Sequence, residues 1–449
     1  MFRRMMVANR GEVAARVLRA CRAMGIESVA VHSTADADSP HLRLADRRIC
    51  IGPAHASGSY LNMDAVLQAA EQTECQAIHP GYGFLAENSL FAERCAAHRI
   101  TFVGPPARLI RLMGDKVEAR RTMAAAGLPT IPGSEGNLRD AAEAAREADR
   151  VGYPVFLKAS AGGGGKGMRL CENRKSLKRA FEEASSEAEK AFGVADLYLE
   201  KAIIGGRHIE FQLLADGWGN AVHLGERECS VQRHHQKLVE ESPSPVIDAA
   251  TRERMGTLIA SAVGGLGYRN AGTVEFLRDP SGELYFMEMN TRLQVEHPVT
   301  EAITGIDIVQ EQIRIAANER LAISRDSVAF SGHAIECRIN AEDPDDGFKP
   351  SPGLIVLFIP PPKTRLDTHL DADCAGYRVP PYYDSLLAKL IAKGTDRRAA
   401  IAAAIKALDG FVIEGIKTTI PLHRRILENP DFVSGDYDVG ILDKMMQGV

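Results

Sequence analysis

The sequence is poor in cysteine, and none of its cysteines has the spacing of a metal or redox site. There are eight in 449 residues, and no two of them form a C-x-x-C pair. So few cysteines in so long a chain do not make a disulfide framework, and their spacing matches no zinc or redox motif. We therefore expect a reducing compartment, with the cytoplasm as the default and an organelle matrix, after loss of a transit peptide, as the alternative.

Long apolar runs and a strong charge of either sign are also missing. The segment 354–359 is among the longest apolar runs, and it has the length of a strand rather than of a membrane span. The first ten residues are basic but lack the apolar stretch of a signal peptide. With 54 basic and 59 acidic residues the net charge is −5, which gives no footprint for nucleic acid or an anionic membrane. We predict neither partner, so any attraction for phosphate must be local.

What the chain does have is length and a regular alternation of strand and helix patterns. Its 449 residues are too many for one compact core, so we expect two to four domains. The strand patterns of the first hundred residues lie at 5–8, 28–32, 77–78 and 101–103, and the helical patterns at 12–24, 62–72 and 85–98. This alternation is typical of a parallel, doubly wound sheet. The dinucleotide fingerprint G-x-G-x-x-G is absent after the first strand, which disfavours a nicotinamide role.

Two further regions follow this one. A second region begins near 114–116 and includes a separate lobe, with a strand at 153–158, a glycine-rich loop, a helix and a strand at 197–200. A third begins near Gly332 and contains a helical pattern at 397–408. We therefore predict three domains, at 1–113, at 114–331 with a lid subdomain at about 132–203, and at 332–449.

The glycine-rich loop predicts contact with phosphate. Four consecutive glycines at 162–165 leave backbone N–H groups unscreened, and such groups can fold over phosphate oxygens as a nest. Lys158 before the loop and Lys166 within it add positive charge. The alternative is a flexible hairpin tip or linker. The loop lacks the Gly-Lys-Ser/Thr ending of a Walker A motif, so it indicates a covering lid rather than a P-loop.

A hairpin further along the chain carries two carboxylates. With a loop at 279–282, Glu275 faces Phe286, and Glu275 and Glu288 then lie diagonally on one face. Such a pair suits Mg²⁺, which prefers oxygen ligands. A loop longer or shorter by one residue would break this argument. The alternative is a solvated face, but the apolar neighbours favour burial, where unpaired carboxylates are costly without a metal.

Two polar stretches have no obvious structural purpose. Residues 289–298 have neither a strand nor a helix period, and Pro298 limits a helix. Their amide, cation and carboxylate side chains indicate a site for a small anion with an acid or base nearby. Residues 226–237 are similar, although a solvated loop is the plainer interpretation. We expect His234 and His235 to contact ligand or core rather than metal, because no third nitrogen ligand is evident.

Taken together, these segments resemble the biotin carboxylase family, whose members use MgATP and bicarbonate to carboxylate biotin. The resemblance runs from Met5 to about Lys444, and its motifs lie at 8–12, 79–83, 113–116, 162–165, 288–298 and 333–344. It implies a multi-domain α/β chain with an ATP-grasp fold. An N-terminal Rossmann-like domain, a mobile lid subdomain and a C-terminal biotin carboxylase domain would accompany that fold.

The resemblance also implies which residues bind the nucleotide and the metal. Lys116 and Lys158 would contact the ATP phosphates, with Gly164 and Gly165 covering them. The adenine would be held by Glu200, Lys201 and Ile203. The rest of the nucleotide site would be lined by His208, Gln232 and His235. The divalent cation, Mg²⁺ or Mn²⁺, would be bound by Glu275, Glu288 and Asn290.

The implied chemistry takes place beside the triphosphate. Bicarbonate would be cradled by Lys237, Arg292, Gln294 and Val295, and Glu296 would deprotonate it as it attacks the γ-phosphate. Carboxyphosphate would result, and the biotin enolate that accepts the carboxyl group would be stabilised by Arg338. A guanidinium suits this last role because it does not lose its proton.

The resemblance implies the biotin carboxylase subunit or domain of an acyl-CoA carboxylase, whose partners are a biotin carboxyl carrier and a carboxyltransferase. The chain has no Met-Lys-Met segment for biotin attachment, so we expect the carrier to come in trans or the chain to be the front part of a longer polypeptide. The family is often dimeric, so a homodimer is expected. Two alternatives stay open: another ATP-grasp ligase that forms carboxyphosphate, as in carbamoyl-phosphate or purine synthesis, and a non-catalytic nucleotide-binding subunit.

Overall fold

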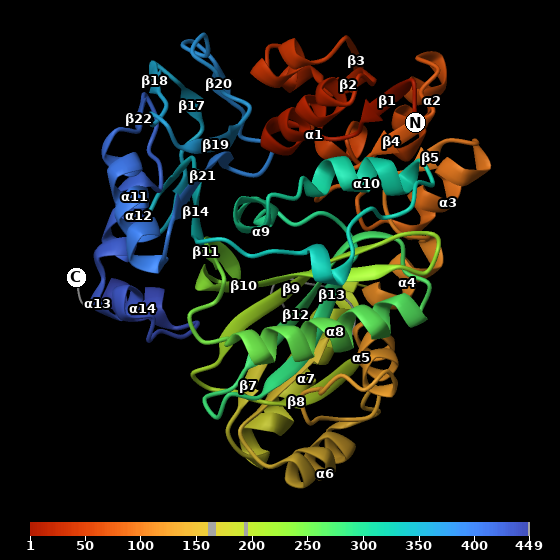
Figure 1. The fold of residues 1–449 in the computed structure, drawn as a ribbon. Helices are drawn as coiled ribbons and strands as arrows, with labels where there is room; N and C mark the ends of the chain where they lie inside the picture. The colour runs from red at the N-terminus through yellow and green to blue at the C-terminus, as the bar shows by residue number, and fades with distance from the viewer. Residues whose placement is uncertain (160–167, 193–195, 448–449) are drawn as a thin grey trace.

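A computed structural model describes residues 1–159, 168–192 and 196–447 of the chain. Figure 1 shows the N-terminal strands and helices at the upper right, the C-terminal elements at the left and a smaller lobe at the bottom. A long sheet crosses the middle and joins these parts. Gly164 and Gly165 lie outside the described residues.

The N-terminal region is the parallel, doubly wound sheet that the alternating patterns predict. Its strands run in the order β3-β2-β1-β4-β5, and all neighbours are parallel. They are β1 (Arg4–Val7), β2 (Glu27–Ser33), β3 (Arg47–Gly52), β4 (Ala77–His79) and β5 (Thr101–Phe102). The helices of this region are α1 (Gly11–Ala23), α2 (Met63–Gln72), α3 (Ser89–Ala97) and α4 (Ala107–Gly114).

One helix start was predicted wrongly. A helix was expected from residue 85, but α3 begins at Ser89. The Asn88 side chain accepts a hydrogen bond from the backbone N–H of Phe91, which caps the helix and fixes its first residue. Leu85 is buried, but it lies in a turn before the helix. Its apolar side chain continued the helical pattern, so the predicted helix started too early.

The central sheet has eight strands and is antiparallel throughout. Its order is β13-β12-β9-β10-β11-β14-β21-β19. The strands are β9 (Arg207–Ala215), β10 (Ala221–Arg233), β11 (Gln236–Ser242), β12 (Asn270–Arg278), β13 (Leu284–Asn290), β14 (His333–Asn340), β19 (Arg365–Thr368) and β21 (Leu386–Gly394). The pairing of β11 with β14 carries one sheet from the second sequence region into the third.

This sheet has an apolar face and a polar face because its strands alternate. On β9, Ile209, Phe211 and Leu213 are buried in a core that also contains residues of the helix α8 (Ala249–Gly265). The residues that alternate with them, His208, Glu210 and Gln212, point to the opposite face. That polar face is covered by α9 (His297–Thr304) and by the N-terminal region, where α10 (Ile308–Ala316) also packs.

The smaller lobe has a core of its own. Its three strands are β7-β6-β8 in spatial order, and both pairings are antiparallel. The elements are α5 (Lys116–Ala125), which leads into the lobe, then α6 (Ala141–Val151), β6 (Val155–Ala159), β7 (Arg169–Cys171), α7 (Arg174–Phe192) and β8 (Leu197–Lys201). Leu157, Leu177 and Leu199 are buried in this core. Figure 1 places the lobe below the central sheet.

The hairpin of β12 and β13 corrects the predicted register. The Asp279 backbone N–H bonds to the Glu283 carbonyl, so the connection is shorter than predicted and Phe276 faces Phe286. This shift alone would put Glu275 and Glu288 on opposite faces. A β-bulge between the Phe276 and Glu275 pairs moves the register again, and Glu275 lies directly opposite Glu288. The predicted register was wrong, but the bulge restores the pairing of the carboxylates.

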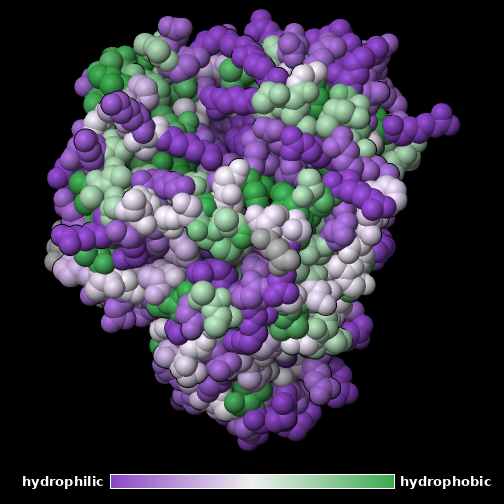
Figure 2. All heavy atoms as spheres, in the orientation of Figure 1, coloured by the Kyte–Doolittle hydropathy of each residue, from purple (hydrophilic) through white to green (hydrophobic). Residues whose placement is uncertain are grey.

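The C-terminal elements pack on β14 and β21. The helices are α11 (Arg397–Asp409), α12 (Ile420–Glu428), α13 (Pro430–Ser434) and α14 (Ile441–Gln447). The short strands are β15 (Glu342–Asp343), β16 (Lys349–Pro350), β17 (Gly353–Leu354), β18 (Leu357–Ile359), β20 (Arg378–Val379) and β22 (Val412–Glu414). Figure 2 shows apolar surface at the upper left, where Figure 1 places β17 and β18 and where Val356 and Ile359 are exposed. Among the described residues, no helix combines the length and the hydropathy needed to cross a membrane.

Candidate active site

Most of the predicted site residues line one cavity of about 760 Å³. It lies where the polar face of the central sheet meets segments of the N-terminal region and of the C-terminal region. The predicted residues that line it are Lys116, Lys158, His208, Gln232, His235, Lys237, Glu275, Glu288, Asn290, Arg292, Gln294, Val295, Glu296 and Arg338. Residues from several distant strands and loops therefore converge on one space.

The three predicted adenine contacts, Glu200, Lys201 and Ile203, lie outside this cavity. Glu200 accepts a hydrogen bond from the Lys158 ammonium at 2.6 Å. Lys201 donates to the backbone carbonyls of Gly152 and Tyr153 at 2.9 and 2.8 Å. These side chains connect the strands of the smaller lobe in the structure, and their contact with adenine stays a prediction.

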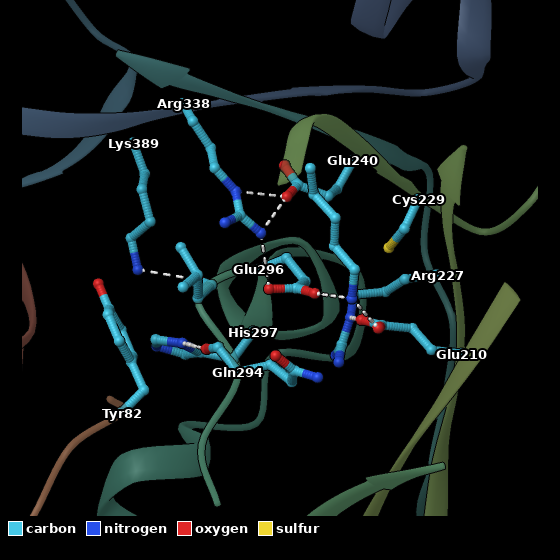
Figure 3. Close-up of polar contacts among 12 residues, drawn as sticks. Tyr82, Glu210, Arg227, Cys229, Glu240, Gln294, Glu296, His297, Arg338 and Lys389 are labelled. Carbon is cyan, nitrogen blue, oxygen red and sulfur yellow. Dashed lines mark hydrogen bonds and ion pairs between the residues drawn. The ribbon is translucent and has the colours of Figure 1, made fainter. Parts of the chain in front are cut away.

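Glu296 is a fully buried carboxylate held between two cations. It directly precedes α9, and its Oε1 accepts a hydrogen bond from Lys237 Nζ at 2.6 Å. Its Oε2 accepts one from Arg338 Nη2 at 2.9 Å, as Figure 3 shows. Burial opposes ionisation, but Lys237, Arg338 and Arg227 together hold the pKa of Glu296 well below its usual range. The site thus contains a desolvated, ionised oxygen base.

Lys237 connects three carboxylates at the base of the cavity. Its Nζ donates to Glu210 at 2.6 Å, to Glu275 at 3.0 Å and to Glu296 at 2.6 Å. Burial would lower the pKa of this ammonium, but the three carboxylates raise it well above its usual range. Lys237 is therefore a fixed positive charge and an unsuitable proton donor or acceptor.

The polar stretch after β13 forms a single hydrogen-bonded network. The Arg292 guanidinium donates to Asn290 Oδ1 at 2.7 Å, to Gln294 Oε1 at 2.9 Å and to Glu87 at 2.8 Å. The absence of an apolar period is thereby explained, because these side chains contact one another rather than a core. Pro298 does not prevent a helix here: it lies in the first turn of α9, where its missing N–H costs nothing.

The predicted metal ligands lie side by side on β12 and β13. Asn290 Nδ2 donates to Glu275 Oε1 at 2.7 Å, and Glu288 lies 3.5 Å from Lys116 Nζ. Glu275 is also 3.0 Å from His208 Nε2. Burial opposes ionisation, but Lys237 and His208 hold the pKa of Glu275 below its usual range. Glu288 is partly exposed and faces the cavity, so its oxygens are accessible to a cation; this oxygen-rich donor set fits Mg²⁺ or Mn²⁺.

The stretch 226–237 is not a solvated loop. Most of it belongs to β10 and is buried, and only His234 and His235 lie in the turn before β11, with φ of 47° and 66°. Arg227 is fully buried and donates to Glu210, Gln212 and Thr300. The plainer interpretation was therefore wrong, because the charged side chains pair with one another beneath the cavity.

Several buried charged residues around the cavity were missed. Glu210, Arg227, Glu240, Glu336 and Lys389 are all fully buried. Some left a signal in the sequence: on β14, residues 336, 338 and 340 are polar and alternate with apolar residues, which places three polar side chains on one face of a buried strand. Lys389 left none, because its neighbours 386–392 are otherwise apolar.

Comparison with known families matches nearly the whole chain in three parts. Residues 1–110 match the biotin carboxylase N-terminal domain, and residues 336–444 match the biotin carboxylase C-terminal domain. Between them, residues 115–324 match the ATP-binding domain of the carbamoyl-phosphate synthase L chain.

Similar proteins share the full length of the chain. A biotin carboxylase of a Nostoc species is 53% identical over 446 residues, which cover 99% of each chain. The biotin carboxylase domain of Hydrogenobacter thermophilus 2-oxoglutarate carboxylase, solved as a dimer with MgADP, ADP and bicarbonate, is 49% identical with a TM-score of 0.94, covering 100% of this chain and 98% of that one. A biotin carboxylase of Campylobacter jejuni, solved as a complex with beta-gamma-ATP, is 48% identical with a TM-score of 0.95, covering 99% of each chain.

Proposed function

The chain belongs to the biotin carboxylase family, and from this premise we propose how the residues of its cavity divide the family's reaction among them. That reaction is the ATP-dependent carboxylation of biotin by bicarbonate, the first half-reaction of a biotin-dependent carboxylase. ATP, Mg²⁺ and bicarbonate are its reactants and cofactor. The flanking matches and the full-length relatives disfavour both a carbamoyl-phosphate-type ligase and a non-catalytic subunit.

Glu296 is the base in the first step. Bicarbonate lies against Arg292 and Lys237, with Gln294 and the Val295 backbone completing its cradle. Glu296 takes the bicarbonate proton while the bicarbonate oxygen attacks the γ-phosphate of ATP, which gives carboxyphosphate and ADP. A carboxylate held ionised by Lys237 and Arg338 is ready to accept that proton. Anionic substrates compete for these cations and so raise the basicity of Glu296 when they bind.

The triphosphate is bound by the cations at the other end of the cavity. Lys116 and Lys158 face it and offset its charge, and His208, Gln232 and His235 line the space beside it. Glu275, Glu288 and Asn290 would hold the divalent cation, which offsets the charge that develops on the transferred phosphoryl group. Gly164 and Gly165 cover the phosphates, while Glu200, Lys201 and Ile203 hold the adenine when the lid closes.

Arg338 serves the second step. Carboxyphosphate releases CO₂ and phosphate, and the phosphate takes the N1′ proton of biotin. The ureido oxygen then carries negative charge, which the Arg338 guanidinium stabilises; N1′ attacks CO₂ and carboxybiotin results. Arg338 lines the cavity close to Glu296, so the charge is stabilised where CO₂ is released.

The domains and partners follow the same proposal. Residues 1–113, 114–331 and 332–449 form the three domains, with the lid at about 132–203. The biotin arrives on a carboxyl carrier and leaves toward a carboxyltransferase. The relative from Hydrogenobacter thermophilus is a dimer, which supports a homodimer here. A cytoplasmic location is supported by eight free cysteines.

The burial of Glu296 between Lys237 and Arg338 is the observation that carries this proposal. The test is ATP hydrolysis with Mg²⁺, measured with and without bicarbonate and then with free biotin. Hydrolysis that requires bicarbonate and increases with biotin is the expected result. If the rate of bicarbonate-dependent hydrolysis changes with neither free nor carrier-linked biotin, the chain is another carboxyphosphate-forming ligase. Hydrolysis independent of bicarbonate would contradict the roles of Lys237, Arg292 and Glu296.

A further inference from the structure

Arg338 is hydrogen-bonded to a second carboxylate, Glu240, which has no role in the proposed reaction. Glu240 on β11 is fully buried, and its Oε1 accepts a hydrogen bond from Arg338 Nε at 2.5 Å. The same oxygen also contacts Arg338 Nη2, whose other partner is Glu296 Oε2 at 2.9 Å. Figure 3 shows the guanidinium lying between these two carboxyl groups. The orientation of Arg338 is therefore fixed from two sides.

A second carboxyl lies directly across from Glu240. Glu336 is its cross-strand partner in the pairing of β11 with β14, so both side chains are on the same face of the sheet. Glu336 is fully buried, and among the described residues neither of its oxygens has a hydrogen-bond partner. The Glu240 Oε2 has none either. Two neighbouring carboxyls that are both buried away from water cannot both be ionised without a large cost in free energy.

The charged groups around the pair leave no cation for Glu336. The titratable groups that face the pair from the neighbouring elements are Lys237 on β11, Cys229 on β10, Arg338 on β14, Lys389 on β21 and Glu296 before α9. Lys237 contacts three other carboxylates, Lys389 lies 3.1 Å from Glu12, and Arg338 is shared by Glu240 and Glu296. Burial and the nearby Glu240 raise the pKa of Glu336 well above its usual range, although Lys389 opposes this.

We propose that Glu240 is a positioning residue that fixes Arg338 for the biotin step, and that Glu336 holds a proton beside it so that Glu240 alone carries the charge. The inference rests on the role proposed above for Arg338. When Glu296 accepts the bicarbonate proton, its hold on Arg338 weakens. Glu240 is then the ionised partner that keeps the guanidinium in place while the ureido oxyanion forms.

The pair gives the biotin step a pH dependence of its own. Burial raises the pKa of Glu240 to about 7, although Arg338 opposes the shift. As the pH falls through this value, Glu240 takes up a proton and its hold on Arg338 weakens. We expect carboxylation of free biotin to decline there, while bicarbonate-dependent ATP hydrolysis without biotin, which needs Glu296 and Lys237 but not this anchor, declines less.

The test compares Glu240→Gln with wild type in both reactions. The glutamine keeps the shape but loses the charge. We expect kcat/KM for free biotin to fall roughly 10- to 100-fold, the range for a reacting group misplaced by up to about 1 Å, and its inflection near pH 7 to vanish. ATP hydrolysis without biotin should change far less. Equal losses in both reactions, or an unchanged inflection, would mean that Glu240 has only a structural role and would overturn the inference.

Two further variants separate a loss of charge at Glu240 from a general loss of stability. Glu240→Asp retains the charge, so it should keep part of the biotin carboxylation activity that Glu240→Gln loses, together with the pH inflection. If Glu240→Gln does not fold but Glu240→Asp does, the absence of an inflection in Glu240→Asp would overturn the proposal. Glu241→Gln is the matched control: Glu241 is the next residue of β11 but bonds His333, Arg397 and Tyr437 away from Arg338. It should lower stability without separating the two reactions.

The proton on Glu336 has a readout that does not depend on turnover. Infrared difference spectra should be taken by subtracting the spectrum of Glu336→Gln from that of wild type, and should contain the C=O band of the protonated Glu336 carboxyl. The same band should appear when the double variant Glu240→Gln/Glu336→Gln is subtracted from Glu240→Gln. A wild-type difference spectrum without this band would overturn this half of the inference. Arg338→Gln distinguishes failure of the role proposed for Arg338 from failure of the role proposed for Glu240. If Arg338→Gln carboxylates biotin like wild type, the role of Arg338 is wrong. If Arg338→Gln is impaired and Glu240→Gln is not, only the positioning role of Glu240 is wrong.

Discussion

The Lys389 ammonium lies 3.1 Å from the Glu12 carboxylate, although the two residues come from opposite ends of the chain. Glu12 lies in the first turn of α1 in the N-terminal region and Lys389 lies on β21, and both are buried. Lys389 also donates to the Val295 carbonyl at 2.9 Å, next to Glu296. One side chain thus connects the two terminal regions with the loop that contains the proposed base.

Removing this ammonium should destabilise the fold. Lys389→Met leaves the Glu12 carboxyl buried without its cation, and breaking a buried ion pair in this way costs about 3–5 kcal/mol. Chemical denaturation measures the loss in free energy of unfolding. Lys393→Met is the control, because Lys393 is on the same strand but exposed, and it should cost much less. The double variant with Glu12→Gln should recover part of the loss; a Lys389→Met protein as stable as wild type would contradict the account.

Stability should fall with pH below neutrality because of buried histidines. Burial lowers the pKa of His41 and of His79 to about 3, far below the value of about 6.5 for an unfolded chain. Between these two pH values the unfolded state binds more protons than the folded state, so the free energy of unfolding decreases as the pH falls from about 6.5. Each of these histidines contributes a decrease of up to about 1.4 kcal/mol for each pH unit. Urea unfolding from pH 6.5 to 4.5 measures this slope. His41→Asn should make the slope shallower, and an unchanged slope would show that His41 is protonated in the folded protein.

Metal dependence should be sensitive to Glu288. If Glu288→Gln removes a ligand, the Mg²⁺ concentration for half-maximal ATP hydrolysis should rise at least about tenfold, since even residues behind the ligands contribute that much. The control is Glu283→Gln, which removes an exposed carboxylate from the same hairpin. Equal Mg²⁺ requirements in both variants and wild type would remove Glu288 from the metal site.

The parts of the site that could be predicted from sequence are those with a local pattern. The polar stretch after β13 and the paired carboxylates stood out because they interrupt the period expected of a buried element. The β-bulge opposite Phe276 could not be foreseen, because bulges have no fixed sequence signature, and so the register was wrong although Glu275 and Glu288 do face each other.

The contacts that could not be predicted join distant strands. Lys389 and Glu12 meet because α1 packs against β21, the neighbour of β14 in the central sheet, and no local spacing encodes that arrangement. Glu240 and Glu336 are similar: they lie far apart in the sequence, and only the pairing of β11 with β14 brings them together beside Arg338. Sequence patterns indicate which face of a strand is polar, but the strand order decides which charges pair.

The role of Glu296 as the base is tested by the rate at which Glu296→Gln hydrolyses ATP in the presence of bicarbonate. The glutamine keeps the size of the side chain next to Lys237 and Arg338 but cannot accept the bicarbonate proton. We predict that kcat falls about 10²- to 10⁴-fold, the contribution of a general base, while the affinity for ATP stays close to that of wild type. A variant that hydrolyses ATP at the wild-type rate in the presence of bicarbonate would show that another group takes the proton.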